Sequence, residues 1–285
     1  MWIAAMGKID LYGAEIAYRR WGSGEPVVLL HSSTGSSAQW TVLGESLQAD
    51  FQVLAPDLYG YGESQPWPGR QAFSLADEAE IVEALIRIHG GHAHIVGHSY
   101  GGAVALKVAA RGCVSVRSLT LIEPVAFHIL SNGDPLGEAY LEQVSDIAEF
   151  VQSSLSMGDR AGAMHAFVDY WNGPGAWEAL GDAQRGKIMA VAAKVPLDFW
   201  ATMSEPANLA DYLALTTPTL LFSGTESPAP VRRVVSLLDV AFRDVRLSVI
   251  PGAGHMLPLT HAAAVNRDIA AHPRRHRPAR TPAAA

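Results

Sequence analysis

Short, uniformly apolar runs alternate along this chain with segments that carry an apolar stripe. Residues 26–33, 51–57 and 92–99 are runs of the first kind. Such runs are typical of parallel strands that are buried on both faces of a sheet. Residues 74–90 begin at Ser74, a favourable N-cap, and carry apolar side chains at spacings near 3.6 residues. The pattern therefore predicts buried strands with an amphipathic helix among them.

The same alternation extends over most of the chain. Two short strands that turn at Gly13 are expected within residues 8–22. Further helices are expected at 37–48, 100–112, 229–242 and 261–272, and further strands at 116–124, 218–224 and 246–250. Because strands that alternate with helices form parallel sheets, the chain is predicted to be an α/β protein. We expect a mostly parallel sheet with helices on both faces.

Residues 125–212 interrupt the alternation. They lack runs of β-branched residues, so several helices are expected, and they hold ten aromatic residues. An ordinary helical subdomain would explain this composition. We favour a helical cap over a site at the carboxyl ends of the strands, where open α/β sheets bind ligands. The chain is thus divided into a core (1–124 and 213–272), the cap, and a basic tail (273–285) that has no apolar face and is expected to be disordered.

Composition narrows the classes of function. Hydrophobic residues make up 49% and charged residues 17% of the 285 residues, enough for a large core. The formal net charge of −7 disfavours nucleic acid and anionic membranes as partners. Cys113 is the only cysteine, which excludes an intrachain disulfide and suits a reducing compartment. Since neither a signal peptide nor a transmembrane run is evident, we expect a cytoplasmic protein, and its oligomeric state stays open.

The segment Gly97-His98-Ser99-Tyr100-Gly101 carries the strongest chemical signal. It matches the pattern G-x-S-x-G and lies between a predicted strand and a predicted helix, the context that gives this pattern meaning. The turn must be sharp, and glycines avoid crowding against the strand and helix. The helix start presents free N–H groups and a positive dipole end, which suit an oxyanion. A tight turn without chemistry is the alternative, but the context favours Ser99 as a nucleophile.

Two loops at other strand ends fit the same site. The segment from His31 to Gly35 follows an apolar strand and is placed to donate a second N–H to an oxyanion. His255 lies on the glycine-rich segment 252–255, after the strand at 246–250. A late histidine on such a loop is suited to act as the base for Ser99.

Four segments together resemble the α/β-hydrolase fold family. They are LLHSSTGSS, PDLYGYGES, VGHSYGG and PGAGH. The resemblance runs from about Lys8 to His272, with a cap inserted between the strands at 116–123 and 218–223. It implies that Ser99 is the nucleophile and His255 the general base.

The resemblance also implies an oxyanion hole, formed by the backbone N–H groups of Ser33 and Tyr100. We expect no cofactor and no metal at this site.

The third member of a triad is harder to assign. The family usually places an aspartate three residues after the glycine that ends the strand at 218–223, but that position is Ser227 here. Glu226 lies one residue earlier. Glu123 ends the strand at 116–123, a position from which haloalkane dehalogenases take their acid. An unpaired glutamate at the end of so apolar a strand would be costly to bury. We therefore favour Glu123 as the partner of His255, with Glu226 as the fallback.

Other histidines have simpler explanations. His98 is expected to point away from the nucleophile and to be structural. His92 and His94 lie on one face of a strand, but no third metal ligand accompanies them. His128 and His165 lie in the cap, where contact with a substrate is an open alternative.

A serine nucleophile forms an acyl-enzyme with an ester, thioester, amide or activated ketone. The first expectation is a carboxylic-ester hydrolase that acts on small or medium apolar substrates. A hydrolase of C–C bonds in diketones, or a cofactor-free haloperoxidase-like enzyme, would use the same triad. A ligand receptor on the same fold is the non-enzymatic alternative, disfavoured by the intact Ser99 and His255.

Overall fold

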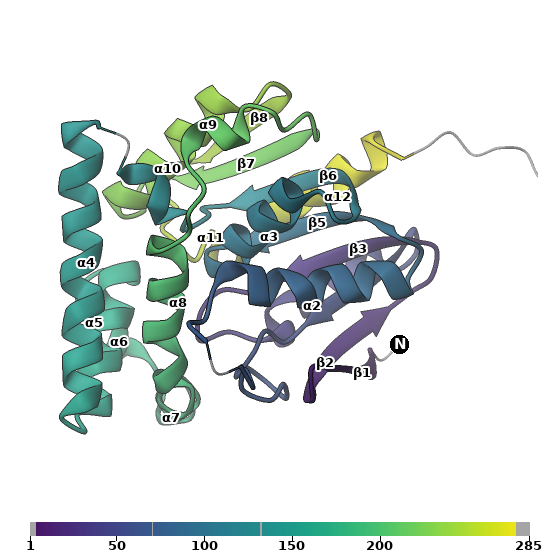
Figure 1. Cartoon of the computed structure of the whole chain (residues 1–285). Helices are drawn as coiled ribbons and strands as arrows, with labels where there is room; N and C mark the ends of the chain where they lie inside the picture. Colours follow the sequence, from purple (N-terminus) through teal and green to yellow (C-terminus); the bar gives the residue numbers. More distant parts are fainter. Residues whose placement is uncertain (1–3, 70, 132, 278–285) are drawn as a thin grey trace, which may run out of the picture.

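An eight-stranded sheet runs through the computed structural model, which describes residues 4–69, 71–131 and 133–277 (Figure 1). Its strands are β1 (Ala5–Leu11), β2 (Ala14–Trp21), β3 (Glu25–Leu30), β4 (Phe51–Pro56), β5 (His92–His98), β6 (Ser115–Ile122), β7 (Thr219–Gly224) and β8 (Val245–Ile250). Their order is β1-β2-β4-β3-β5-β6-β7-β8. Only the pairs β1–β2 and β2–β4 are antiparallel, and the other neighbours are parallel. The predicted fold class is therefore confirmed.

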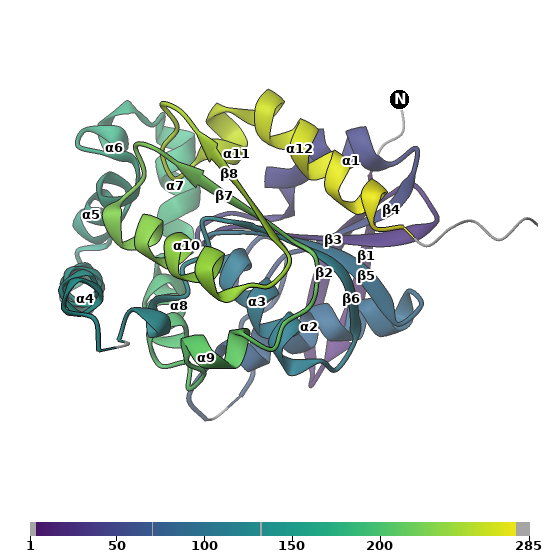
Figure 2. The same cartoon turned by 90° about the horizontal axis from the view of Figure 1, so that it is seen from above.

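Helices cover both faces of the sheet, as its apolar central strands require (Figure 2). They are η1 (Ser37–Trp40), α1 (Thr41–Leu47), α2 (Leu75–Ile88), α3 (Tyr100–Arg111), α10 (Ala229–Ala241), α11 (Leu257–Thr260) and α12 (Ala262–Arg275). The apolar faces of α2, α3 and α10 contribute to one core cluster, and those of α1 and α12 contribute to a second. Since β3, β5 and β7 lie between these clusters, both of their faces are buried, which explains why most of their residues are apolar.

Residues 125–212 form a helical insertion between β6 and β7. Its elements are η2 (Phe127–Leu130), α4 (Pro135–Ser156), α5 (Arg160–Asn172), α6 (Ala176–Ala179), α7 (Asp182–Ala190), η3 (Ala192–Lys194), α8 (Val195–Met203) and α9 (Leu209–Tyr212). Helices α4 to α8 stand beside the edge at which β5 and β6 end (Figure 1). The helices predicted here are present, and they lie at the end of the sheet where the candidate residues gather.

The carboxyl-terminal helix is longer than the sequence predicts. α12 continues to Arg275, and Arg274 donates two hydrogen bonds to Asp50 Oδ2 at 2.8 and 2.9 Å. The guanidinium of Arg277 lies 4.0 Å from the centre of the Phe51 ring. The expectation of a disordered tail from residue 273 is thus wrong for 273–277, because its arginines find partners at the start of β4. Residues 278–285 of that tail lie outside the described residues.

In the described part of the chain, no helix combines the length and the apolar character needed to cross a membrane.

Candidate active site

Ser99 occupies the turn between β5 and α3. Its backbone has φ 55° and ψ −117°, a conformation that residues with a side chain rarely adopt. The turn is held by a hydrogen bond of 2.9 Å from the Ser99 N–H to the carbonyl oxygen of Ile122 on β6. Strained backbone of this kind persists only where the surrounding structure enforces it, and it gathers at functional sites. The sharp turn predicted from the sequence is present.

The flanking glycines permit this turn. A Cβ atom on Gly97 would lie 2.2 Å from the carbonyl oxygen of Gly101. A Cβ atom on Gly101 would lie 2.5 Å from the carbonyl oxygens of Leu30 and His31. The Gly101 N–H also donates to His31 O at 3.1 Å. Any larger residue would push α3 away from β3, so these positions require glycine.

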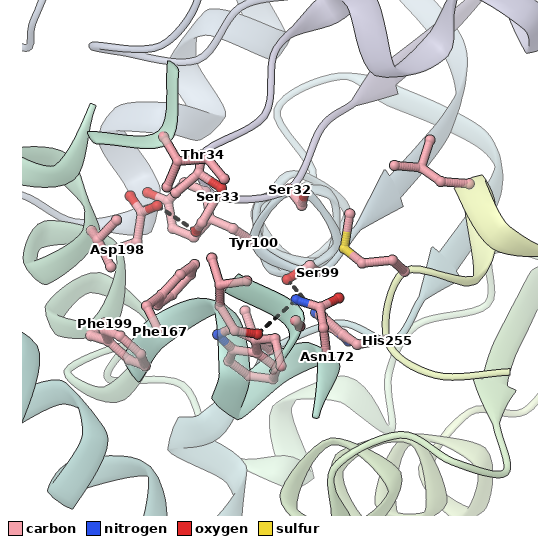
Figure 3. Close-up of a pocket in the computed structure, with 18 of the residues that line it drawn as sticks. Ser32, Ser33, Thr34, Ser99, Tyr100, Phe167, Asn172, Asp198, Phe199 and His255 are labelled. Atoms are coloured by element: carbon pink, nitrogen blue, oxygen red, sulfur yellow. Dashed lines mark hydrogen bonds between the residues drawn. The ribbon is translucent and has the colours of Figure 1, made fainter. Parts of the chain in front are cut away.

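Ser99, His255 and Glu123 form one hydrogen-bonded chain, as predicted. Figure 3 shows the Ser99–His255 end of it. Ser99 Oγ lies 2.8 Å from His255 Nε2, and His255 Nδ1 lies 2.7 Å from Glu123 Oε2. A carboxylate can only accept, so the imidazole proton belongs on Nδ1 and leaves Nε2 free to accept from the serine. The other oxygen of Glu123 accepts the N–H of Gly224 at 2.6 Å. The glutamate is fully buried, and both of its oxygens have partners.

Glu226 does not reach this chain. Its side chain is exposed, and its carboxylate accepts only a long hydrogen bond of 3.4 Å from the neighbouring Thr225 hydroxyl among the described contacts. The backbone explains its direction: the Glu226 N–H donates to the carbonyl of Ala253, which fixes the loop and leaves the side chain in solvent. The structure therefore pairs His255 with the favoured glutamate and not with the fallback.

The two predicted oxyanion donors belong to two different segments. Tyr100 is the first residue of α3, and Ser33 lies in the loop after β3. Both residues line the cavity into which Ser99 opens. In the residues that the structure covers, neither N–H is paired with an acceptor. The cavity that Ser99 lines is thus also lined by two residues with unpaired backbone N–H groups, the kind of donor that an oxyanion requires.

The side chain of His31 stabilises the loop that carries Ser33. Burial lowers the pKa of His31 and keeps its ring neutral. His31 Nδ1 donates to the carbonyl of Ser32 at 2.8 Å, and Nε2 accepts the N–H of Leu58 at 3.0 Å. The next residue after Ser33, Thr34, has a φ of 60°. The loop is therefore a tight, unusual turn that needs contacts with the rest of the molecule.

A cavity of about 370 Å³ lies between the sheet edge and the helical insertion. Most of its wall is apolar, and the insertion supplies Phe127, Phe167, Val168, Trp171, Ala176, Ala179, Leu180, Ile188, Val195 and Phe199. The polar groups on the wall include Ser99 and His255 at one end, and Asn172 and Asp198 on the insertion. The shape suits an apolar small molecule whose reacting group meets Ser99.

Three residues that matter for this site were missed by the sequence analysis. The ring of Trp171 stacks on that of His255, with centroids 4.5 Å apart and planes 29° from parallel. Lys194 and Asp198 form a buried ion pair on the insertion. A signal was present for the pair, because a lysine and an aspartate four residues apart interrupt an otherwise apolar stretch in AVAAKVPLDFWATM.

The remaining histidines lie outside the cavity wall. His98 Nε2 forms a hydrogen bond of 2.9 Å with the backbone carbonyl oxygen of His255 and so helps to fix the loop that carries His255. His128 is bonded to the Tyr212 hydroxyl at 2.7 Å, and His165 lies against Asp169 at 3.3 Å. Neither of these two residues lines the cavity, so the structure gives no support to the alternative that they touch a substrate. His94 is bonded to the Ser118 hydroxyl at 2.7 Å.

Comparison with known proteins agrees with this fold. Residues 25–262 match the model of a family described as the alpha/beta hydrolase fold. A non-heme haloperoxidase of Rhodococcus erythropolis is 29% identical over 268 residues, which are 90% of this chain and 95% of that protein. An alpha/beta hydrolase of Sphaerobacter thermophilus is 25% identical with a TM-score of 0.74, over 93% of this chain and 99% of its own. A thermophilic esterase of Thermogutta terrifontis is 26% identical with a TM-score of 0.72, over 96% of this chain and 100% of its own.

The packing of the serine turn leads to a test of stability. Gly101→Ala should lower the free energy of unfolding by about 3 kcal/mol or more, because the new methyl group meets backbone oxygens that cannot move separately. Gly186→Ala is the matched control: Gly186 lies exposed in α7, and nothing is within 4 Å of its added methyl group. This control should gain about 0.5–1 kcal/mol. Equal stabilities of the two variants in chemical denaturation would contradict the analysis.

Proposed function

Because this chain belongs to the alpha/beta hydrolase fold family, we propose that it is a serine hydrolase that cleaves carboxylic esters of small or medium apolar substrates. One observation carries the proposal. Ser99 Oγ lies 2.8 Å from an imidazole nitrogen of His255, whose other nitrogen is bonded to the buried Glu123. This arrangement activates a serine hydroxyl that is otherwise a poor nucleophile.

Acylation follows from the positions of these groups. His255 Nε2 takes the proton of Ser99 as its oxygen attacks the ester carbonyl carbon. The negative charge that develops on the carbonyl oxygen is stabilised by the N–H groups of Ser33 and Tyr100. Glu123 stabilises the imidazolium, which then gives its proton to the departing alcohol.

Deacylation repeats these steps with water in place of the serine. His255 takes a proton from water, whose oxygen attacks the acyl carbon, and the returning proton releases Ser99. Trp171, stacked on the ring of His255, restricts the ring and offers its π-face to the imidazolium, since cations are attracted to that face.

In this proposal the helical insertion (residues 125–212) acts as a cap, and residues 1–124 and 213–272 form the catalytic core. The apolar wall from the insertion would bind the acyl or alcohol group of the ester. Since that wall has no free cationic group among the described residues, anionic acyl groups find no charge partner on it.

Perhydrolysis is a second candidate, favoured by the 29% identity to the haloperoxidase of Rhodococcus erythropolis over 90% of this chain. Hydrogen peroxide would attack the acyl-enzyme in place of water, releasing a peracid and the free serine. The peracid would then oxidise a halide in solution. Addition of hydrogen peroxide to the ester assay separates the two candidates, because only a perhydrolase forms peracid beside the carboxylic acid.

Ser99 should be the one residue that an organophosphonate labels. Mass spectrometry of the digested protein should find a single adduct on the peptide that contains Ser99. Ser99→Ala should remove the label and lower kcat by about 10⁴–10⁶-fold, as expected for loss of a triad nucleophile. An adduct on another peptide, or full activity of the variant, would refute the assignment.

Glu123→Gln should lower kcat by about 10⁴-fold, because an amide favours the wrong tautomer of His255. The amide oxygen can still accept the Gly224 N–H, so the melting temperature should change little. Glu226→Gln is the matched control and should keep full activity, since this carboxylate is exposed and remote from His255. If Glu123→Gln turns over p-nitrophenyl esters at the wild-type rate, Glu123 is not the acid.

The apolar wall predicts a dependence on acyl chain length. Each added methylene contributes about 0.8 kcal/mol when buried, so kcat/KM should rise about three- to fourfold per carbon until the cavity is full. Ile188→Ala enlarges the cavity and should move this limit to longer chains. Ile88→Ala alters an exposed residue on α2 and should leave the limit unchanged. A flat or falling series from acetate to hexanoate would contradict an apolar acyl site.

A further inference from the structure

A buried ionic cluster lies behind the two oxyanion donors. Lys194 Nζ is 3.0 Å from Glu78 Oε1 and forms an ion pair with Asp198 Oδ1. The three side chains are 7%, 0% and 5% exposed, respectively. Glu78 belongs to α2, whereas Lys194 and Asp198 belong to η3 and α8, so the cluster joins the core to the insertion. Burying three charges is costly unless each is well paired, which implies a constrained geometry.

The side-chain hydroxyls of Ser33 and Tyr100 both donate hydrogen bonds to this cluster. Ser33 Oγ donates to Asp198 Oδ2 at 2.5 Å, a contact drawn in Figure 3. The hydroxyl of Tyr100 donates to Glu78 Oε1 at 3.2 Å and lies 3.5 Å from Lys194 Nζ. One ammonium group therefore bridges the two carboxylates that hold the two donor residues.

Lys194 keeps its charge in this cluster, whereas burial raises the pKa of the Glu78 carboxyl against the opposing effect of the ammonium. Burial opposes the charged form of Lys194, but the carboxylates of Asp198 and Glu78 outweigh this effect and raise its pKa. The ammonium also lies 4.4 Å from the ring centre of Phe73 and 4.8 Å from that of Tyr100, where the π-faces attract a cation. The group that bridges the two carboxyl side chains is therefore a charged ammonium.

Both carboxylate oxygens of Asp198 already have hydrogen-bond donors within the protein. Its Oδ2 accepts the hydroxyl of Tyr61 at 2.5 Å as well as that of Ser33, and its Oδ1 faces Lys194. Although Asp198 lies on the cavity wall, both of its oxygens already accept from donors of the protein itself.

We propose that Asp198, held in place by Lys194, is a positioning residue for the oxyanion hole. It fixes the Ser33 hydroxyl and thereby sets the Ser33 N–H at the distance that the acyl oxygen needs. The N–H of Tyr100 is held in position by α3, which begins at that residue. Ser33, in contrast, lies on a loop without regular structure. The loop donor is thus the one that depends on an anchor. The inference rests on the proposed function. It implies that catalysis by the core requires α8, which carries Asp198, to be packed against the Ser33 loop.

The kinetic test compares Asp198→Asn, Ser33→Ala and the double variant. Loss of one oxyanion donor costs about 10²–10³-fold in kcat, so a misplaced donor should cost about 10–100-fold. KM should stay within about twofold, and affinity for a trifluoromethyl ketone, whose adduct with Ser99 carries an oxyanion, should fall by the same factor as kcat. Ser33→Ala removes the donor of this contact. In Asp198→Asn the one amide oxygen stays with Lys194, so the NH2 group faces the Ser33 hydroxyl and cannot accept from it. Because both changes remove the same contact, the double variant should be no slower than the slower single variant.

Glu205→Gln is the matched control. Glu205 is also a buried carboxylate of the segment after α8, and it pairs at 2.7 Å with Lys107 on α3, so it too joins the insertion to the core. It does not line the cavity. This variant should lower the melting temperature and leave kcat and ketone affinity unchanged. A purely structural role of Asp198 would give the same result for Asp198→Asn, and that result would overturn the proposal, as would multiplicative losses in the double variant.

Hydrogen exchange gives a readout that needs no turnover. Amides of the loop at residues 31–36 should exchange about tenfold faster in Asp198→Asn and Ser33→Ala than in the wild type or Glu205→Gln, since a charge-assisted hydrogen bond is lost. If the wild type cleaves no ester and takes no phosphonate label, the proposed function fails, and the exchange rates still decide whether Asp198 anchors the loop. Unchanged exchange in Asp198→Asn would refute the anchor.

Discussion

The backbone of Ser99 can hold a φ of 55° only because α3 packs directly against the ends of β3 and β5. That close approach needs glycine at positions 97 and 101, where a methyl group would meet carbonyl oxygens. The same contact brings the start of α3 beside the loop after β3, so the serine, the helix N-terminus and the Ser33 loop share one small volume. The chemistry available at this site follows from that one steric constraint.

Ionisable side chains are buried at the end of the sheet that carries Ser99, and Glu123 and Lys194 there are paired with polar groups. Glu123 lies between the N–H of Gly224 and the ring of His255, and Lys194 lies between two carboxylates. Removing one partner from such a pair would leave an uncompensated charge in an apolar interior. The polar groups therefore specify one arrangement of the loops, which the non-directional packing of apolar side chains cannot do alone.

The helical insertion contributes more than an apolar wall. Through Trp171 it contacts the face of His255, and through Asp198 it contacts the loop of Ser33. Both contacts join segments far apart in the chain and act on groups that the proposed reaction uses. A movement of α5 or α8 away from the sheet would therefore alter the histidine and the oxyanion donors as well as open the cavity.

The strands, the serine turn and His255 were predictable because their signals are contiguous: an apolar run, a glycine pair, a motif within a few residues. Glu123 was favoured by a local argument as well, since a glutamate ending so apolar a strand needs a partner. The direction of Glu226, the stacking of Trp171, the anchoring of Ser33 by Asp198 and the ordered residues 273–277 were decided only by the tertiary structure. Each depends on a contact across the fold, between residues whose spacing in the sequence carries no periodic pattern. Such contacts form only when the packing of helices on the sheet brings their side chains together.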